Sequence, residues 1–591
     1  MKRLWSSTKN QNRMMMLLTG AVIWLLLALC FDFYYDLNDD VVIKNIISGA
    51  YTGTPEGHTL QLLYPLGRLL SLLYRVVPAF PWYALFLVGC LCGSFVCMGI
   101  RLLGYADNNR KRFFLLAGFT LLFMALSFYE LIFVQYTVVA AVLVLTAAVY
   151  FVTTPADLVT GSFLVKNIPT ILLLLVAFCL RSEMMLLCTP LLAMAGIYVW
   201  SREKKIFSKQ SFLKYGLFLC IVAVGMAVSF LSDRAAYSAK EWQESTAFFD
   251  ARTQVYDFTW YPSYEENEEF YDSIGISAAE FTLLDEYNFG LDKRITVDTL
   301  NQIAEYQKER IPQKRIGTIL SEYLYRMRQY SFPITWDETN DMPYNLIVVL
   351  LYGLCVIAAV SAKDKTMFIK LPIMLALRSI PWLYLLYKGR LVTRVTHPLY
   401  FLEIGILVFL LISDDKIRRD KTENEKSACK ILEKVILSGI FLIFCIAVVL
   451  QVKRIGEESS RREYVNLPME TLALYAQENP DNFYYLDVYS TVAFSQKMFS
   501  ADDGNIQNYD IMGGWTSKTE LSRKKETAYG IQDVEKDFLT KDTLFFAAQK
   551  ERDVTWLTDY YRELGKTVSV LKTESLGEKE TDFIIYRLKE E

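Results

Sequence analysis

The chain has 591 residues, of which 53% are apolar and 21% charged, and its formal net charge is −3. This balance argues against nucleic acid or another polyanion as a partner. The apolar residues gather in runs of about 17–22 residues, close to the length that crosses about 30 Å of hydrocarbon, which excludes an ordinary soluble protein. The ten cysteines lie mostly in these runs, and we expect them to pack as small apolar residues.

The first apolar run covers about 14–31 and follows a basic N-terminus, which the positive-inside rule places in the cytoplasm. The run is too long for the core of a signal peptide, so we expect it to be retained. Residues 32–81 are predicted to form the first outer loop. Within it, 58–78 is apolar but interrupted by Arg68 and Arg75, which is typical of an interfacial amphipathic helix.

Further spans are predicted along the chain, about eleven in total. The short basic loops between them, together with residues 1–13, then all face the cytoplasm. The sequence thus predicts a multi-pass α-helical protein of the cell membrane. The further spans lie at about 81–103, 113–129, 132–151, 167–180, 184–200, 215–231, 344–362, 368–387, 399–413 and 435–452.

Two long polar segments are predicted outside the membrane. Residues 232–343 are acidic, with helical patterns at 277–287 and 297–310. Residues 453–591 alternate helical and strand-like patterns, which indicates a small extracytoplasmic α/β domain. Its helical patterns lie at 469–477 and 554–564, and its strand-like runs at 483–488, 543–547, 567–571 and 582–588. The predicted domains are therefore 1–231, 232–343, 344–452 and 453–591.

Basic residues are unexpected in short outer loops, yet Arg181 lies in one, and Lys388, Arg390 and Arg394 lie in another. An anion such as a lipid phosphate would explain them, since the planar fork of arginine can bind two phosphate oxygens. The alternative is that they anchor lipid headgroups. Arg378 lies inside a span, where an isolated charge costs at least a few kcal/mol. We expect it to face a polar cavity or to pair with a carboxylate.

Acidic residues follow the first span in the stretch FDFYYDLNDD at 31–40. Asp39 and Asp40 are candidate catalytic residues, one of which removes a proton from an acceptor hydroxyl. The other, with Asp40 as the candidate ligand, binds a divalent cation such as Mg²⁺ or Mn²⁺. The alternative is that these residues cap the following helix, because Asn and Asp are good N-caps.

Four polar residues are candidates for substrate binding. Glu183 either pairs locally with Arg181 or binds sugar hydroxyls. His58 and His397, the two histidines of the chain, are predicted outside near the membrane, where chance placement is the alternative. Arg378 completes this group. The sequence shows no phosphate-binding glycine loop, Rossmann fingerprint, zinc-ligand spacing or Gly-x-Ser-x-Gly elbow. We therefore expect a sugar donor to arrive as a lipid rather than a nucleotide.

Taken together, these residues resemble the GT-C class of membrane glycosyltransferases over roughly 1–415. Asn38-Asp39-Asp40 resembles the acidic motif of the first outer loop of that class. Arg181-Ser182-Glu183 is similar to the Arg-x-Glu of several bacterial members, and 388–394 resembles a basic late outer loop that contacts the lipid phosphate. The paired His-His-Pro of some members is absent.

The resemblance implies an inverting transfer of a sugar from polyprenyl phosphate to a hydroxyl of a glycan or other acceptor, as in polysaccharide biosynthesis of the cell envelope. Asp39 or Asp40 would activate the acceptor, and Arg390 and Arg394 would stabilise the departing phosphate. Two alternatives stay open. A polysaccharide polymerase or ligase would depend on the arginines more than on the aspartates. A transporter or flippase would show broken helices in both halves of an internal repeat, and no repeat is visible.

Overall fold

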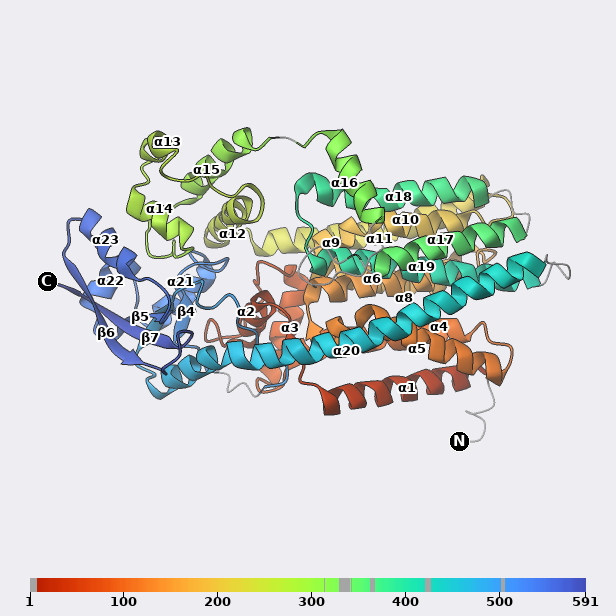
Figure 1. The fold of residues 1–591 in the computed structure, drawn as a ribbon, viewed down its shortest axis with the longest axis horizontal. Helices are drawn as coiled ribbons and strands as arrows, with labels where there is room; N and C mark the ends of the chain where they lie inside the picture. The colour runs from red at the N-terminus through yellow and green to blue at the C-terminus, as the bar shows by residue number, and fades with distance from the viewer. Residues whose placement is uncertain are drawn as a thin grey trace. The chain divides into compact units, whose positions relative to one another are not determined.

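The computed structural model describes residues 8–312, 314–328, 341, 343–361, 367–419, 427–500 and 505–591. The chain divides into two compact units, each built from segments far apart in the sequence (Figure 1). We call residues 1–36, 83–231 and 314–457 the membrane unit, and 37–82, 232–313 and 458–591 the polar unit. Most of the first outer loop, the acidic segment and the C-terminal segment, which the sequence analysis treated separately, thus form one unit.

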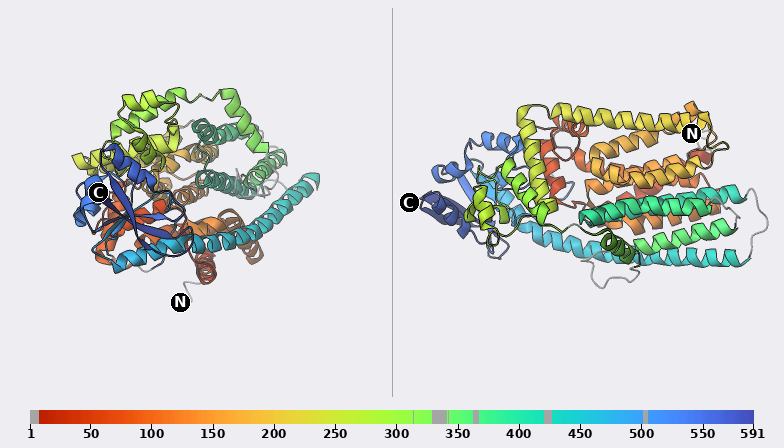
Figure 2. Two further views of the ribbon diagram at one scale, coloured as in Figure 1. Left: turned by 60° about the vertical axis from the view of Figure 1, so that its left-hand side comes forward. Right: turned by 90° about the horizontal axis from the view of Figure 1, so that it is seen from above.

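Long apolar helices characterise the membrane unit, and Figure 2 shows them running alongside one another. Among the described residues, seven helices are long and apolar enough to cross a membrane. They are α1 (Thr8–Cys30), α4 (Trp82–Leu103), α5 (Asn109–Ile132), α11 (Lys209–Ala236), α18 (Met367–Lys388), α19 (Thr393–Arg419) and α20 (Ser427–Glu478). A bent pair, α7 (Thr160–Lys166) and α8 (Ile168–Leu180), adds an eighth span if it counts as one.

Three other apolar helices are shorter than a span: α6 (Tyr136–Val152), α10 (Thr189–Trp200) and α17 (Tyr344–Ser361). The 17 residues of α6 reach about 26 Å at 1.5 Å per residue, less than the hydrocarbon thickness of about 30 Å. This helix is apolar and buried nearly all round, and it packs against α8 and α19. Such a helix is enclosed by protein. The count of about eleven spans therefore stays a prediction.

The membrane unit also contains a short parallel pair of strands. In it, β1 (Tyr34–Tyr35) pairs with β2 (Phe133–Val134), and the amide of Asp36 donates to the carbonyl of Val134 at 2.9 Å. The pair fixes the backbone of the membrane unit as far as Asp36. The helix α5 runs on to Ile132, so Glu130 lies in its last turn rather than between the spans predicted at 113–129 and 132–151.

A sheet of five strands lies in the polar unit, in the order β4-β3-β5-β7-β6. The strands β4, β3 and β5 are parallel to one another, and β7 is antiparallel to both β5 and β6. Four strands lie at the predicted runs, whereas β4 has only three residues, all half-buried, and shows no alternation. The strands are β3 (Phe483–Leu486), β4 (Tyr509–Ile511), β5 (Leu544–Gln549), β6 (Val568–Ser575) and β7 (Phe583–Glu590).

One hydrophobic core joins the helices of 240–310 to this sheet. Leu283 and Leu300 share it with Tyr485, Phe546 and Leu557, which explains why segments distant in sequence form one unit. The predicted helix at 469–477 is the end of α20, and α2 is the helix that the capping alternative for Asp39 and Asp40 expected. The helices of the unit are α2 (Asn38–Ser48), α3 (Tyr64–Val76), α12 (Lys240–Thr253), the π-helix η1 (Gln254–Thr259), α13 (Glu268–Ser273), α14 (Ala278–Asp285), α15 (Val297–Arg310), α21 (Glu520–Ala528), α22 (Val534–Thr540) and α23 (Thr555–Glu563).

Candidate functional site

The two candidate catalytic aspartates lie in the first turn of α2, in the polar unit. The N-cap of this helix is Leu37, so neither aspartate is the cap, although both carboxylates gain from the positive end of the helix dipole. Asp40 is completely buried. Asp39 is half-buried, and the indole nitrogen Nε1 of Trp515 donates to its Oδ1 at 3.1 Å. Of the two residues, only Asp39 is partly exposed.

A divalent cation at Asp40 would need several oxygen ligands. In the part of the chain that the structure describes, no group of three or more His, Cys, Asp or Glu side chains could hold a metal ion. A divalent cation stays a prediction from the sequence, and no step proposed below depends on it.

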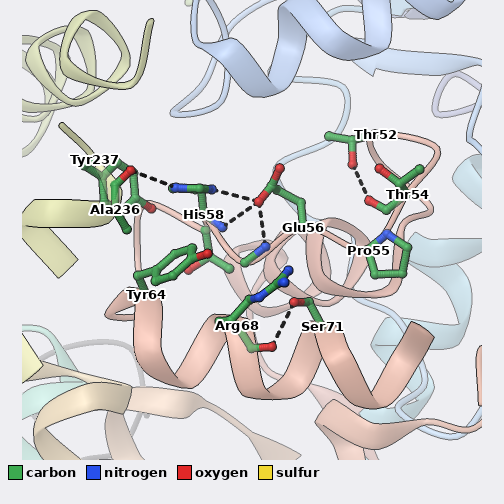
Figure 3. A network of polar contacts seen from close by, with 12 residues as sticks. Thr52, Thr54, Pro55, Glu56, His58, Tyr64, Arg68, Ser71, Ala236 and Tyr237 are labelled. Carbon is green, nitrogen blue, oxygen red and sulfur yellow. Dashed lines mark hydrogen bonds and ion pairs between the residues drawn. The ribbon is translucent and has the colours of Figure 1, made fainter. Parts of the chain in front are cut away.

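His58, also in the polar unit, has both ring nitrogens engaged (Figure 3). Its Nδ1 lies 2.8 Å from Oε1 of Glu56, and its Nε2 lies 3.1 Å from the carbonyl oxygen of Ala236. The ring also stacks on Trp242, with ring centres 4.1 Å apart. These contacts hold His58 within the fold of the polar unit, and substrate binding by His58 stays a prediction.

Glu56 is the centre of this network. Its carboxylate accepts hydrogen bonds from the amide of Gly57 at 2.8 Å, from His58 and from Nζ of Lys524 at 2.7 Å. Burial alone would raise the pKa of Glu56, but the hydrogen bonds from His58 and Lys524 outweigh it and hold the pKa well below its usual value. The network thus ties the first outer loop to α21 through an ionised carboxylate.

We expect Glu56→Gln to lower the free energy of unfolding by about 1–3 kcal/mol at pH 7, because a charged acceptor with several donors is lost. The folded pKa lies below the unfolded value near 4.5, so the stabilisation is complete above that pH and disappears as the pH falls below it. Thermal unfolding of the full chain at pH 7 and pH 4 measures this, with the exposed Glu551→Gln as control. Equal stability of Glu56→Gln and wild type at pH 7 would contradict the network's role.

In the membrane unit, three basic residues surround the turn between α18 and α19. Lys388 is the last residue of α18 and is exposed, while Arg390 and Arg394 are half-buried. Gly389 adopts a left-handed φ of 68°, which lets its amide and that of Arg390 bond back to the carbonyls of Leu386 and Leu385. Arg394 lies in the first turn of α19, where a cation is disfavoured by the helix dipole and an anion is favoured.

A second basic position is the break between α8 and α9 (Ser182–Leu187). Arg181 has extended backbone angles there, and its Nε lies 3.2 Å from Oε2 of Glu183. Its guanidinium also lies over the ring of Tyr136, 5.4 Å from the ring centre. Glu183 is therefore paired locally with Arg181, which is the first of the two alternatives that its spacing left open.

Arg378 pairs with a carboxylate, which is one of the two alternatives that we expected for this residue. Its Nε lies 3.0 and 3.1 Å from the two oxygens of Glu403 in α19, and its Nη1 donates to the hydroxyl of Tyr323 at 2.8 Å. Tyr352 donates to the same carboxylate at 3.1 Å. The arginine is only 2% exposed, so the geometry favours a structural role over substrate binding.

His397 is likewise enclosed within the membrane unit. It lies in α19, the residue is 5% exposed, and its Nδ1 lies 3.4 Å from Oε1 of Glu130 in α5. The structure thus brings Arg181 to Glu183, Arg378 to Glu403 and His397 to Glu130, and Asp39 to Trp515 in the polar unit. Sequence reasoning missed Glu403, although a single carboxylate in the apolar run 399–413 is a usable signal.

Comparison with known proteins gives little further information. No family model matches the chain. No curated protein matches it either. Among solved structures, a crystal structure of ArnT from Cupriavidus metallidurans bound to undecaprenyl phosphate is similar to this chain, with a TM-score of 0.39 and 11% sequence identity over 97% of each chain.

Proposed function

We propose that this protein is a membrane glycosyltransferase that moves a sugar from a polyprenyl-phosphate donor to an acceptor hydroxyl at the outer membrane face, with inversion. The observation that carries the proposal is the cluster of Lys388, Arg390 and Arg394 around one turn between two apolar helices. Cations at the end of membrane helices suit the phosphate of a lipid whose chain lies in the bilayer. The motif resemblance at Asn38-Asp39-Asp40 and at 388–394 supports the same conclusion.

In the proposed reaction, Asp39 accepts the proton of the acceptor hydroxyl as its oxygen attacks the anomeric carbon. The bond from that carbon to the phosphate oxygen breaks, and the polyprenyl phosphate leaves as an anion. Arg390 and Arg394 stabilise the negative charge that develops on the phosphate. Electrostatic stabilisation of this kind is usually the largest single contribution to lowering the barrier of a reaction. A single displacement of this kind inverts the anomeric centre.

The residues of this proposal divide by role. Trp515 positions Asp39 through its indole hydrogen bond, while Asp40 supports the start of α2 from the interior. Arg181, with Glu183 as its partner, is a second contact for the phosphate. The distribution of basic loops supports an N-terminus in the cytoplasm and a polar unit outside the cell membrane.

The double variant Arg390→Ala/Arg394→Ala should bind polyprenyl phosphate at least tenfold more weakly than wild type. Each charge-assisted hydrogen bond contributes about 1.5–3 kcal/mol, and 1.4 kcal/mol corresponds to a factor of ten. Binding of polyprenyl phosphate to the full chain in nanodiscs measures this, with the uncharged polyprenol as the ligand control.

The matched control variant is Arg110→Ala, which removes an exposed arginine beside another membrane helix. Unchanged binding in the double variant, or equal binding of polyprenol and polyprenyl phosphate, would remove the proposed phosphate site. If the arginine variants abolish turnover while Asp39→Asn leaves it intact, the polymerase or ligase alternative is favoured instead.

A further inference from the structure

A recess of about 300 Å³ lies in the polar unit, at the carboxyl end of the edge strand β4. Ligand sites in α/β sheets favour the carboxyl ends of parallel strands. The residues that line it are Gly290, Leu291, Lys293, Tyr485, Asp510, Ile511, Met512, Ser517, Lys518, Ser522, Glu526, Gln532, Asp533 and Val534.

The wall of the recess is held in place by backbone contacts between two segments of the chain. The amide of Gly290 donates to the carbonyl of Met512 at 2.7 Å. A side chain at 290 would collide with this carbonyl and with the hydroxyl of Ser517, so glycine is required here. Lys518 donates to the carbonyls of Asp292 and Ile295, the latter at 2.6 Å, and closes the same wall.

Three carboxyl groups line the recess, those of Asp510, Glu526 and Asp533, and each of the first two has a tyrosine partner. The hydroxyl of Tyr51 donates to Oδ2 of Asp510 at 2.5 Å, and that of Tyr485 donates to Oε1 of Glu526 at 3.1 Å. Burial raises the pKa of Glu526 to about 7 and also raises the pKa of Asp510. Burial lowers the pKa of Lys518 to about 7. Groups that are desolvated in this way around a recess mark candidate ligand sites.

Ser517 adds a hydroxyl to the lining of the recess, and the residue is only 8% exposed. A serine hydroxyl can both donate and accept a hydrogen bond, so it can pair with a polar group of a ligand in the recess.

The lining selects among ligand classes. The carboxyl groups of Asp510, Glu526 and Asp533 are nearly balanced by the amino groups of Lys293 and Lys518, so the lining favours a neutral ligand over a strongly charged one. No group of three or more potential metal-binding side chains occurs where the structure describes the chain. Carboxyl and hydroxyl groups suit a ligand that presents several hydroxyls, while Leu291, Met512 and Val534 suit its C–H faces. A neutral sugar ring has both kinds of surface.

We propose that this recess binds a neutral sugar residue of a glycan, with Asp510, Glu526 and Ser517 as hydrogen-bonding residues. Binding here does not require the transfer reaction, so this proposal can be tested independently of the catalytic role of Asp39. The polar unit would then have a function of its own, which is to bind a glycan through one of the glycan's sugar residues.

The test is saturation-transfer NMR and titration of the full chain in detergent with a panel of neutral monosaccharides, namely glucose, galactose, rhamnose and N-acetylglucosamine. At least one should bind saturably, and Glu526→Ala should weaken that binding at least tenfold. The exposed Glu551→Ala is the matched control and should bind as wild type does. Asp510→Asn, which keeps the shape of the side chain, is the second variant, and thermal unfolding verifies that each variant folds.

Three results would overturn the proposal. The first is that no neutral sugar binds. The second is that sugar binding is unchanged in both Glu526→Ala and Asp510→Asn. The third is that inorganic phosphate or Ca²⁺ binds in place of the sugars and loses its affinity in these same variants, which would assign the recess to a different class of ligand.

Discussion

Asp39→Asn should reduce turnover of a polyprenyl-phosphate sugar by a factor of about 10²–10⁴, the usual contribution of a general base. Asparagine keeps the shape of the side chain and can still accept the indole hydrogen bond of Trp515, but it cannot take up a proton. Binding of polyprenyl phosphate should be unchanged, because the proposed phosphate contacts are Arg390, Arg394, Lys388 and Arg181. The measurement is the initial rate of release of free polyprenyl phosphate, together with the affinity for that lipid.

Two further variants separate catalysis from folding. Asp40→Asn should lower stability rather than act on the chemical step, because Asp40 is completely buried in the first turn of α2. Trp515→Phe should slow turnover less than Asp39→Asn does, because it removes only the group that positions the carboxylate. Wild-type turnover in a well-folded Asp39→Asn variant would exclude the proposed base.

Loss of one member of the buried Arg378–Glu403 pair should destabilise the membrane unit by about 3–5 kcal/mol, because the remaining charge stays buried without its partner. Arg378→Met and Glu403→Leu are the single variants. The double variant Arg378→Met/Glu403→Leu should be more stable than the sum of the single effects indicates, since apolar side chains of similar volume replace both charges.

Unfolding of the full chain in a detergent titration measures these effects. Tyr323→Phe is the control, because it removes only the neutral hydroxyl that Arg378 contacts at 2.8 Å and should cost about 1 kcal/mol. Additive effects of the two charge variants would mean that the pair does not act as a unit. A single variant with wild-type stability would contradict the structural role given to Arg378.

Much of the helical architecture could be predicted from apolar runs and basic loops. The break at Arg181 and the turn at 388–394 were also predicted, because polar residues interrupt the apolar pattern there. The helix α2 was expected only as the helix that the aspartates would cap, because its 11 residues, mixed polar and apolar, are stabilised by burial among distant segments. The span count was not settled, because a short apolar helix such as α6 can be enclosed by protein.

The partners of the candidate residues were the least predictable part. Trp515 follows Asp39 by 476 positions, and Lys524 follows Glu56 by 468. Such contacts depend on how strands and helices assemble, and a single sequence gives no pattern for them. Arg378 lies between the predictable helices and the unpredictable contacts. Its need for a carboxylate was predictable from the cost of a buried charge, but Glu403 as that carboxylate was not.

The release of polyprenyl phosphate tests the central claim most directly. The full chain in liposomes would receive a panel of polyprenyl-phosphate-linked sugars, with cell-envelope glycans as acceptors, and the product's anomeric configuration would be read by NMR. The account predicts release with at least one lipid-linked sugar, inversion at the anomeric carbon, and loss of the reaction in Asp39→Asn. No release from any lipid-linked sugar by a protein that binds polyprenyl phosphate, or a product with retained configuration, would contradict it.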